Sequence, residues 1–303
     1  MSHAHDHDGH SHNTPVTYNK AFFISIVANG LFVILQIFYA YIANSTSLLA
    51  DAFHNLGDVL GLILAWIAMG LMKRKPTERT TYGLKKTSIL AALVNGALLV
   101  FTCGIIATEA VYKFISPSET QALAVMVVAG IGIVVNGTTA LLFLRGSEDL
   151  NIRGAYLHLF YDALVSVGVV ISAGLLYYTH WLWIDPVVGL LIALVILKGT
   201  WSLFADSFRL IIDGVPSSIS WTEVSTFLLE KSGVKGIHDL HIWAMSTQEN
   251  ALSVHLYMPE EQLTDVLRAQ WVEELKKQFG IQHATIQIER TAVDCIDACH
   301  EPH

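Results

Sequence analysis

Charged residues are scarce in this sequence. Of its 303 residues, 15% are Asp, Glu, Lys or Arg, whereas 53% are hydrophobic. Soluble domains carry about a quarter charged residues, so this balance indicates a membrane protein. The charge that is present has the wrong sign for a nucleic-acid-binding protein, because the formal net charge is −8 and such proteins need a basic face.

Cysteine is scarce as well, and a secretion signal is lacking. Three cysteines in a chain of this length do not form a disulfide framework. The first residues, MSHAHDHDGHSHNTP, lack the basic and apolar regions of a signal peptide. They combine histidine with aspartate, glycine and other polar residues, so we expect a disordered, cytosolic, histidine-rich leader over residues 1–17 that binds metal weakly. An expression tag is the alternative, although tags are usually unbroken histidine runs.

Long apolar runs are abundant. Six of them could each cross about 30 Å of hydrocarbon as a helix, which predicts a six-helix membrane domain over residues 18–212. The runs are Ala21–Ala43, Leu48–Met72, Thr87–Ala110, Ala122–Leu144, Ala155–Tyr178 and Trp181–Leu203. Among the links between the runs, those after the second and fourth hold nearly all the basic residues, including Arg145 and Arg153. Since basic links stay on the cytosolic side, we expect both termini in the cytosol.

The chain changes character after Pro216. The segment SISWTEVSTFLLEKS predicts an amphipathic helix, and VKGIHDLHIWAMS and NALSVHLYM predict two strands. A second amphipathic helix, EEQLTDVLRAQWVEELKKQF, precedes a third strand, HATIQIE. The order predicts a cytosolic α+β domain over residues 213–291, with its helices on one face of a sheet. A tail, residues 292–303, follows it.

The second apolar run contains charged residues that a membrane segment normally avoids. Asp51, His54 and Asp58 are spaced i, i+3 and i+7, so they share one face of a helix. A charged residue at the bilayer centre costs at least about 2.5 kcal/mol, so each should have a partner or a function. Asp51 lies near the outer end of the helix, where capping or water contact is easy, and we expect it to support a site rather than bind an ion.

The fifth run repeats the pattern. His158 and Asp162 are again four residues apart, and Asp58 and Asp162 both fall within about one turn of the membrane midplane. If the two faces meet, two imidazoles and two carboxylates converge, and this set suits a tetrahedral Zn²⁺ ion. The carboxylates would balance the charge of the ion in a medium of low dielectric constant. The alternative is that each residue makes only a hydrogen bond between helices.

Five segments of the sequence resemble those of a known protein family. They are SLLADAFHNLGD, YGLKKTSILAALVNG, HLFYDALVSVGV, IDPVVGLLIA and GIHDLHIWAM. Together they resemble the cation diffusion facilitator family of zinc and heavy-metal exporters, which includes bacterial zinc and cadmium efflux proteins and ZnT-like transporters. The similarity extends over residues 18–290, which is nearly the whole chain.

This resemblance implies an architecture and an activity. It implies a homodimer in a lipid bilayer, in which each six-helix protomer has a cytosolic domain of ferredoxin-like (metallochaperone-like) fold. It also implies a proton-coupled antiporter that exports Zn²⁺ by alternating access, with Cd²⁺, Co²⁺ and Ni²⁺ as further substrates. The transport site would comprise His54, Asp58, His158 and Asp162. The short link after the fourth run favours a bacterial inner membrane, and in a eukaryote we would expect an organelle membrane.

The same resemblance implies a second metal site in the cytosolic domain. Its ligands would be His238, His255, His283 and Glu289. His238 and His241 are three residues apart and point to opposite faces of an extended strand, so both cannot enter one site without a bend. Cys295 and Cys299 offer thiolates, which suit zinc in a reducing cytosol. The alternative for each histidine is an ordinary surface residue.

Two other functions are compatible with a metal site inside a membrane. An intramembrane zinc protease needs His-Glu-x-x-His, and this sequence does not contain that motif. A metal sensor needs an output domain, and no kinase or DNA-binding signature follows the apolar runs. We therefore expect a secondary transporter without enzyme activity.

Overall fold

The computed structural model describes residues 16–144, 150–259 and 264–291. Most of the expected leader and the whole tail, with Cys295 and Cys299, lie outside these ranges. The side chain of His158 also lies outside the described part of the chain, although its backbone is helical.

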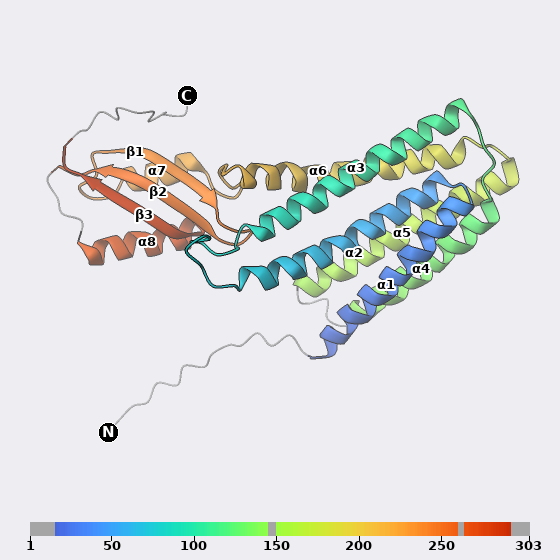
Figure 1. Cartoon of the computed structure of the whole chain (residues 1–303), viewed down its shortest axis with the longest axis horizontal. Helices are drawn as coiled ribbons and strands as arrows, with labels where there is room; N and C mark the ends of the chain where they lie inside the picture. Colours follow the sequence, from blue (N-terminus) through green and yellow to red (C-terminus); the bar gives the residue numbers. More distant parts are fainter. Residues whose placement is uncertain (1–15, 145–149, 260–263, 292–303) are drawn as a thin grey trace, which may run out of the picture. The chain divides into compact units, whose positions relative to one another are not determined.

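Six long helices come first in the described part of the chain (Figure 1). They are α1 (Val16–Ile42), α2 (Thr46–Met72), α3 (Thr87–Ile115), α4 (Ala122–Leu144), α5 (Leu150–Thr179) and α6 (Ile184–Ile211). Each contains a stretch of 19 to 29 residues that is long and apolar enough to cross a membrane, which confirms the six predicted spans. The differences lie at the helix ends, and α6 for example starts at Ile184 rather than at Trp181.

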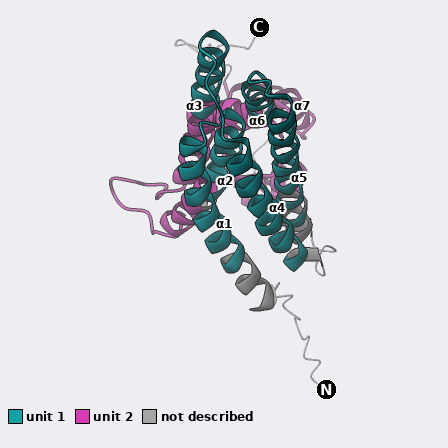
Figure 2. Cartoon of the chain, turned by 90° about the vertical axis from the view of Figure 1, so that its right-hand side faces the viewer, with its two compact units in different colours: residues 1–59, 101–196 teal, residues 60–100, 197–303 magenta. Residues whose placement is uncertain are grey.

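The chain divides into two compact units (Figure 2). The first comprises residues 1–59 and 101–196, and the second comprises residues 60–100 and 197–303. Helices α2, α3 and α6 therefore contribute residues to both units. The domain boundary expected at residue 213 stays a prediction.

In the first unit, α4 packs against both α1 and α5. Phe32, Val125 and Val169 are buried in one apolar cluster. Gly132 of α4 makes this approach possible, because a Cβ atom there would lie 2.8 Å from Cζ of Phe32 and 3.0 Å from Oγ of Ser166. A larger residue at this position would force the side chains of Phe32 and Ser166 to move.

Asp185, in the first turn of α6, fixes the start of α2. Its carboxylate accepts hydrogen bonds from Oγ of Ser45 and of Ser47, both at 2.6 Å, and from the backbone N–H groups of Thr46 (2.6 Å) and Ser47 (3.3 Å). Nζ of Lys113 in α3 also donates to this carboxylate, at 3.3 Å, and the two charged side chains are only 4% and 3% exposed. A carboxylate is stabilising here because the first N–H groups of a helix have no partner within the helix.

The second unit contains a small mixed sheet with two helices. Its elements are α7 (Trp221–Leu229), β1 (Gly236–Ala244), β2 (Asn250–Tyr257), α8 (Asp265–Phe279) and β3 (Ile281–Glu289), in the predicted order. The sheet order is β1-β2-β3, with β1 antiparallel and β3 parallel to β2. This arrangement matches the ferredoxin-like βαββαβ order from its first helix onward.

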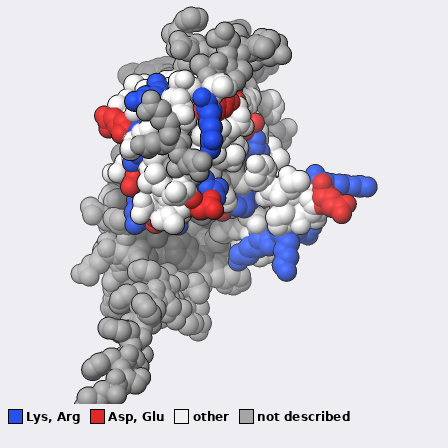
Figure 3. Space-filling view, turned by 90° about the vertical axis from the view of Figure 1, so that its left-hand side faces the viewer, with Lys and Arg blue, Asp and Glu red and all other residues white. Residues whose placement is uncertain are grey.

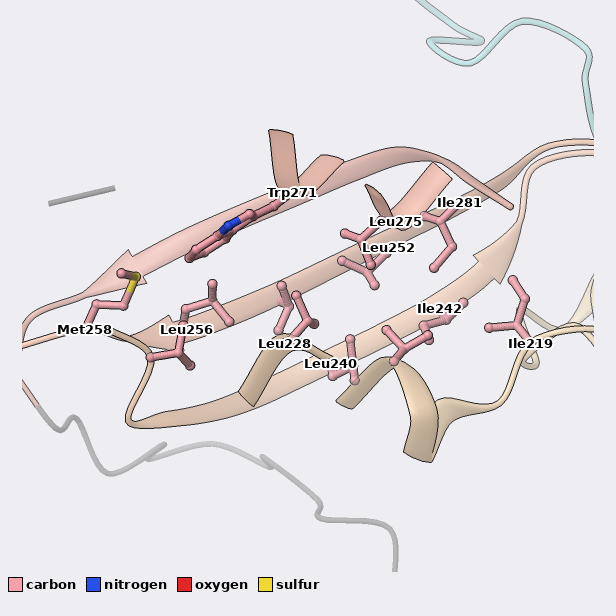
Figure 4. Close-up of a cluster of buried hydrophobic side chains, with 13 residues drawn as sticks. Ile219, Leu228, Leu240, Ile242, Leu252, Leu256, Met258, Trp271, Leu275 and Ile281 are labelled. Carbon is pink, nitrogen blue, oxygen red and sulfur yellow. The ribbon is translucent and has the colours of Figure 1, made fainter. Parts of the chain in front are cut away.

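One face of the sheet shares an apolar core with both helices (Figure 4). Leu252, Val254 and Leu256 are buried at alternate positions of β2, as expected for a strand with one covered face. Leu228 of α7 and Leu275 of α8 join the same core, so the prediction that both helices cover one face is confirmed. Charged side chains of both signs mix on the described surface seen in Figure 3.

Candidate metal centres

Helices α2 and α5 bring three of the predicted ligands together. Nε2 of His54 lies 3.2 Å from Oδ1 of Asp162 and 3.8 Å from Oδ2 of Asp58. One ligand atom from each of the three residues lies within 4.8 Å of the other two, so a single ion could contact all three. His158 is part of α5, but its side chain lies outside the described residues, and its role as the fourth ligand stays a prediction.

The chemistry of this cluster suits a divalent cation. Imidazole nitrogen and carboxylate oxygen are both zinc ligands, and two carboxylates would neutralise a doubly charged ion in an apolar medium. The cluster is not sealed, because the side chains of His54 and Asp58 keep 23% and 25% of their surface accessible, whereas Asp162 keeps 5%. An ion could therefore contact His54 and Asp58 directly, whereas Asp162 is the buried member of the cluster.

Asp51 belongs to a separate buried network beside this cluster. It is fully buried, so the expectation of capping or water contact at this position is wrong. Its Oδ2 accepts hydrogen bonds from Nε2 of Gln36 in α1 (2.6 Å) and from Oγ of Ser166 in α5 (3.1 Å). Oε1 of the same Gln36 amide accepts a bond from Nδ2 of Asn55 at 3.1 Å. Asp51 thus ties three helices together, which agrees with a supporting role.

A second cluster lies on the open face of the small sheet, at the end where β3 finishes. Nε2 of His238 lies 3.0 Å from Oε2 of Glu289, and Nδ1 of His255 lies 3.0 Å from Oε1 of the same carboxylate. Strand register explains this convergence, because His238 is opposite His255 and Glu289 is opposite Tyr257. One ligand atom from each of the three residues falls within 4.8 Å of the others.

His283 does not join this cluster, which corrects the predicted ligand set. It is paired with Ala251 near the start of β3, whereas Gln287 is the residue beside His255. The six residues from His283 to Glu289 extend over roughly 20 Å of strand, so the two side chains cannot share an ion. Cys295 and Cys299, the other predicted ligands, lie outside the described residues and stay predictions.

His283 instead faces Glu249, at 3.3 Å between Nε2 and Oε2. Nζ of Lys85 donates to the same oxygen at 2.5 Å. The Lys85 ammonium holds the pKa of Glu249 below its usual range, with help from His283 and against a smaller opposing effect of burial. This end of β3 is therefore an ordinary ion-paired surface.

An irregularity in β1 supplies the bend that the sequence analysis required. The register shifts between His238 and His241, and Asp239 has a φ of +53°. This β-bulge turns His238 and His241 to the same open face, while Leu240 between them is buried in the core. Asp239 is the residue that sequence reasoning missed. Its only signal was its place between two histidines, in IHDLH.

Sequence comparisons with known proteins match nearly the whole chain. A family described as the cation efflux transmembrane domain matches residues 22–212, and one described as the cation efflux protein, cytoplasmic domain, matches residues 216–291. The chain is 34% identical to the "Cadmium, cobalt and zinc/H(+)-K(+) antiporter" of Bacillus subtilis (strain 168), over 94% of this chain and 93% of the relative. It is 33% identical to the "Metal cation efflux system protein CzcD" of Cupriavidus metallidurans, over 96% and 92%. It is 31% identical to the "Zinc transporter ZitB" of Escherichia coli (strain K12), over 100% and 95%.

Proposed function

The chain belongs to the cation efflux family, and from this premise we propose that it exports Zn²⁺ from the cytosol in exchange for protons. Membership identifies an integral membrane transporter rather than an enzyme. The names of the relatives support zinc, cadmium and cobalt as substrates, and we add Ni²⁺ as a fourth candidate. The name of the Bacillus relative pairs these metals with H⁺ and K⁺, which supports antiport.

The observation that carries the proposal is the convergence of His54, Asp58 and Asp162 between α2 and α5. We assign these residues, together with His158, to a tetrahedral site of two imidazoles and two carboxylates that holds the transported ion. Asp162 is buried and comes from a different helix than the other two described ligands, so movement of α5 relative to α2 would change the site directly. Such a site could release its ion when the helices rearrange.

Competition between metal and protons would couple the two fluxes. A neutral imidazole can bind the ion through its nitrogen lone pair, whereas a protonated imidazole cannot. The ion binds from the cytosol to the deprotonated site, and the helices then rearrange to expose it to the other side. Protonation at His54 and His158 there releases the ion. Return of the protonated site and loss of the protons to the cytosol complete the cycle.

The second unit completes the proposal. We place both termini and the small mixed sheet in the cytosol, and the protein in a bacterial inner membrane as a homodimer. The cluster of His238, His255 and Glu289 would bind cytosolic Zn²⁺ and report its concentration to the membrane helices. The match to the family's cytoplasmic domain over residues 216–291 supports this placement.

Zinc uptake into sealed proteoliposomes tests the proposed transport site. Asp162→Ala removes the buried carboxylate and should reduce uptake to the level of protein-free vesicles. Asp265→Ala removes a carboxylate that is 94% exposed at the start of α8 and should keep the wild-type rate. Uptake by Asp162→Ala at the wild-type rate would refute the assignment of the site.

The same vesicles test proton coupling. With a pH gradient across the membrane, zinc should accumulate against its own gradient, and an ionophore that collapses the pH gradient should abolish this accumulation. Zinc that continues to accumulate uphill without the gradient would refute exchange for protons and leave the transport site itself untouched.

A further inference from the structure

The proposed cytosolic metal site has two more ionisable side chains beside its three candidate ligands. Imidazoles and carboxylates alternate in space along a row of five side chains, which are His238, Glu289, His255, Asp239 and His241. Nε2 of His255 lies 3.6 Å from Oδ2 of Asp239, and Nε2 of His241 lies 2.8 Å from Oδ1 of the same carboxylate. The two ring nitrogens of His255 therefore face two different carboxylates, with Nδ1 toward Glu289 and Nε2 toward Asp239.

We propose that Asp239 is a positioning residue for this metal site, which fixes the ring of His255 so that Nδ1 binds the ion. The proposal rests on the proposed cytosolic metal site of His238, His255 and Glu289. Its geometric basis is the bulge in β1, where Asp239 has a left-handed backbone and its carboxylate lies beside His255.

The reason is the chemistry of a metal-bound imidazole. A histidine binds an ion through one nitrogen, and its other N–H usually donates to a carboxylate, which fixes the tautomer and makes the ligand more basic. Asp239 is the carboxylate on the far side of His255, and the gap of 3.6 Å closes to hydrogen-bond length with a movement of roughly half an ångström. The bond from His241 holds Asp239 in place from its other oxygen.

This arrangement also affects how firmly the described ligands could hold an ion. Two imidazoles and one carboxylate are three protein ligands among the described residues, and zinc prefers four. A carboxylate that accepts the second N–H of a metal-bound imidazole strengthens that ligand. Asp239 supplies that strengthening to His255, while His238 and His255 stay close, with 5.2 Å between ring centroids.

A purely conformational role for Asp239 is the competing explanation, and the backbone allows the two roles to be separated. At a φ of +53°, asparagine and glycine are both tolerated, whereas most other residues are strained. Asp239→Asn keeps the shape of the side chain and removes its charge. Asp239→Gly removes the side chain and keeps the bulge. Both variants should fold, so a loss of metal affinity in both would report the missing carboxylate.

The experiment uses the full chain carrying Asp162→Ala, so that the proposed transport site does not contribute. Zn²⁺ affinity is measured by competition with a chromophoric chelator, and Co²⁺ provides an absorption spectrum of the site. The signal of interest is the part that His238→Ala removes. Asp239→Asn and Asp239→Gly should each weaken this ion by roughly 10–100-fold and change the Co²⁺ bands. The matched carboxylate-to-amide control, Asp265→Asn, should change neither.

Two outcomes separate failure of this inference from failure of the site. If Asp239→Asn and Asp239→Gly bind within about twofold of the parent while His238→Ala loses the ion, the site stands and the positioning role is refuted. If His238→Ala itself keeps the ion, the cytosolic site is refuted and the role of Asp239 falls with it. Thermal unfolding without metal checks that both Asp239 variants keep the parent's midpoint.

Discussion

Removal of Asp185 tests what holds the start of α2 in place. In Asp185→Ala, the ammonium of Lys113 stays buried, and its other hydrogen bond in the described chain is to the carbonyl oxygen of Asn44, at 2.5 Å. The two serine hydroxyls and two N–H groups at the start of α2 lose their acceptor at the same time. Breaking a buried ion pair by removing one partner costs about 3–5 kcal/mol, and we expect a loss of that size.

Removal of the other partner should cost less. In Lys113→Met, the carboxylate of Asp185 keeps its four neutral donors, so no buried charge is left without hydrogen bonds. The direct loss is the hydrogen bond between two charged groups, which contributes about 1.5–3 kcal/mol. The structure therefore predicts that Asp185→Ala loses more free energy of unfolding than Lys113→Met.

Thermal unfolding of the detergent-solubilised protein, followed by tryptophan fluorescence, measures both variants. At about 2–4 °C per kcal/mol, Asp185→Ala should lower the midpoint by roughly 6–20 °C, and Lys113→Met should lower it by less. Asp265→Ala, at an exposed position, should leave it unchanged. A loss for Lys113→Met that equals or exceeds the loss for Asp185→Ala would refute the reasoning, since the energy would then lie in the ion pair and not in the neutral donors.

Two further predictions concern other contacts. Gly189→Ala in α6 should lower the unfolding midpoint, because its Cβ would lie 2.8 Å from the carbonyl carbon of Thr46, whereas Gly199→Ala in the same helix has nothing within 4 Å and should be neutral or stabilising by up to about 1 kcal/mol. Equal midpoints for both variants would contradict the close approach of α6 to α2. Because Lys85 lowers the pKa of Glu249, the stabilisation from this contact is complete above the ordinary carboxyl pKa and is lost as the pH falls through the lowered value. Lys85→Gln should therefore make the midpoint less dependent on acid pH, and an unchanged pH profile would count against the contact.

The parts of the fold that sequence could predict depend on local periodicity. Six apolar runs of sufficient length lead to six helices, and the alternation in segments such as NALSVHLYM leads to strands with one buried face. The spacing of His54 and Asp58 also fixes a shared helical face without any knowledge of packing. That Asp162 meets this face from α5 was a hypothesis from matched depth, and the distance of 3.2 Å to His54 supports it.

The errors arise where register or packing decides. The family resemblance implied His283 as a ligand of the cytosolic site, but the pairing of β3 with β2 places Gln287, and not His283, beside His255. The bulge at Asp239 adds one residue to β1, so counting with a period of two gives the wrong face for His241. The burial of Asp51 depends on Gln36 and Ser166 from two other helices, which no local pattern reveals.

The side-chain amide of Gln36 determines the direction in which the predicted ligands of α2 point. Its nitrogen is bonded to Asp51 and its oxygen to Asn55, so one side chain of α1 grips two successive turns of α2. Successive residues of an α-helix lie about 100° apart around its axis. If α2 rotated about its axis by even part of that angle, both hydrogen bonds would break. His54 directly precedes Asn55. Gln36, which is not a predicted metal ligand, therefore fixes the rotation of α2 and with it the direction in which the imidazole of His54 points.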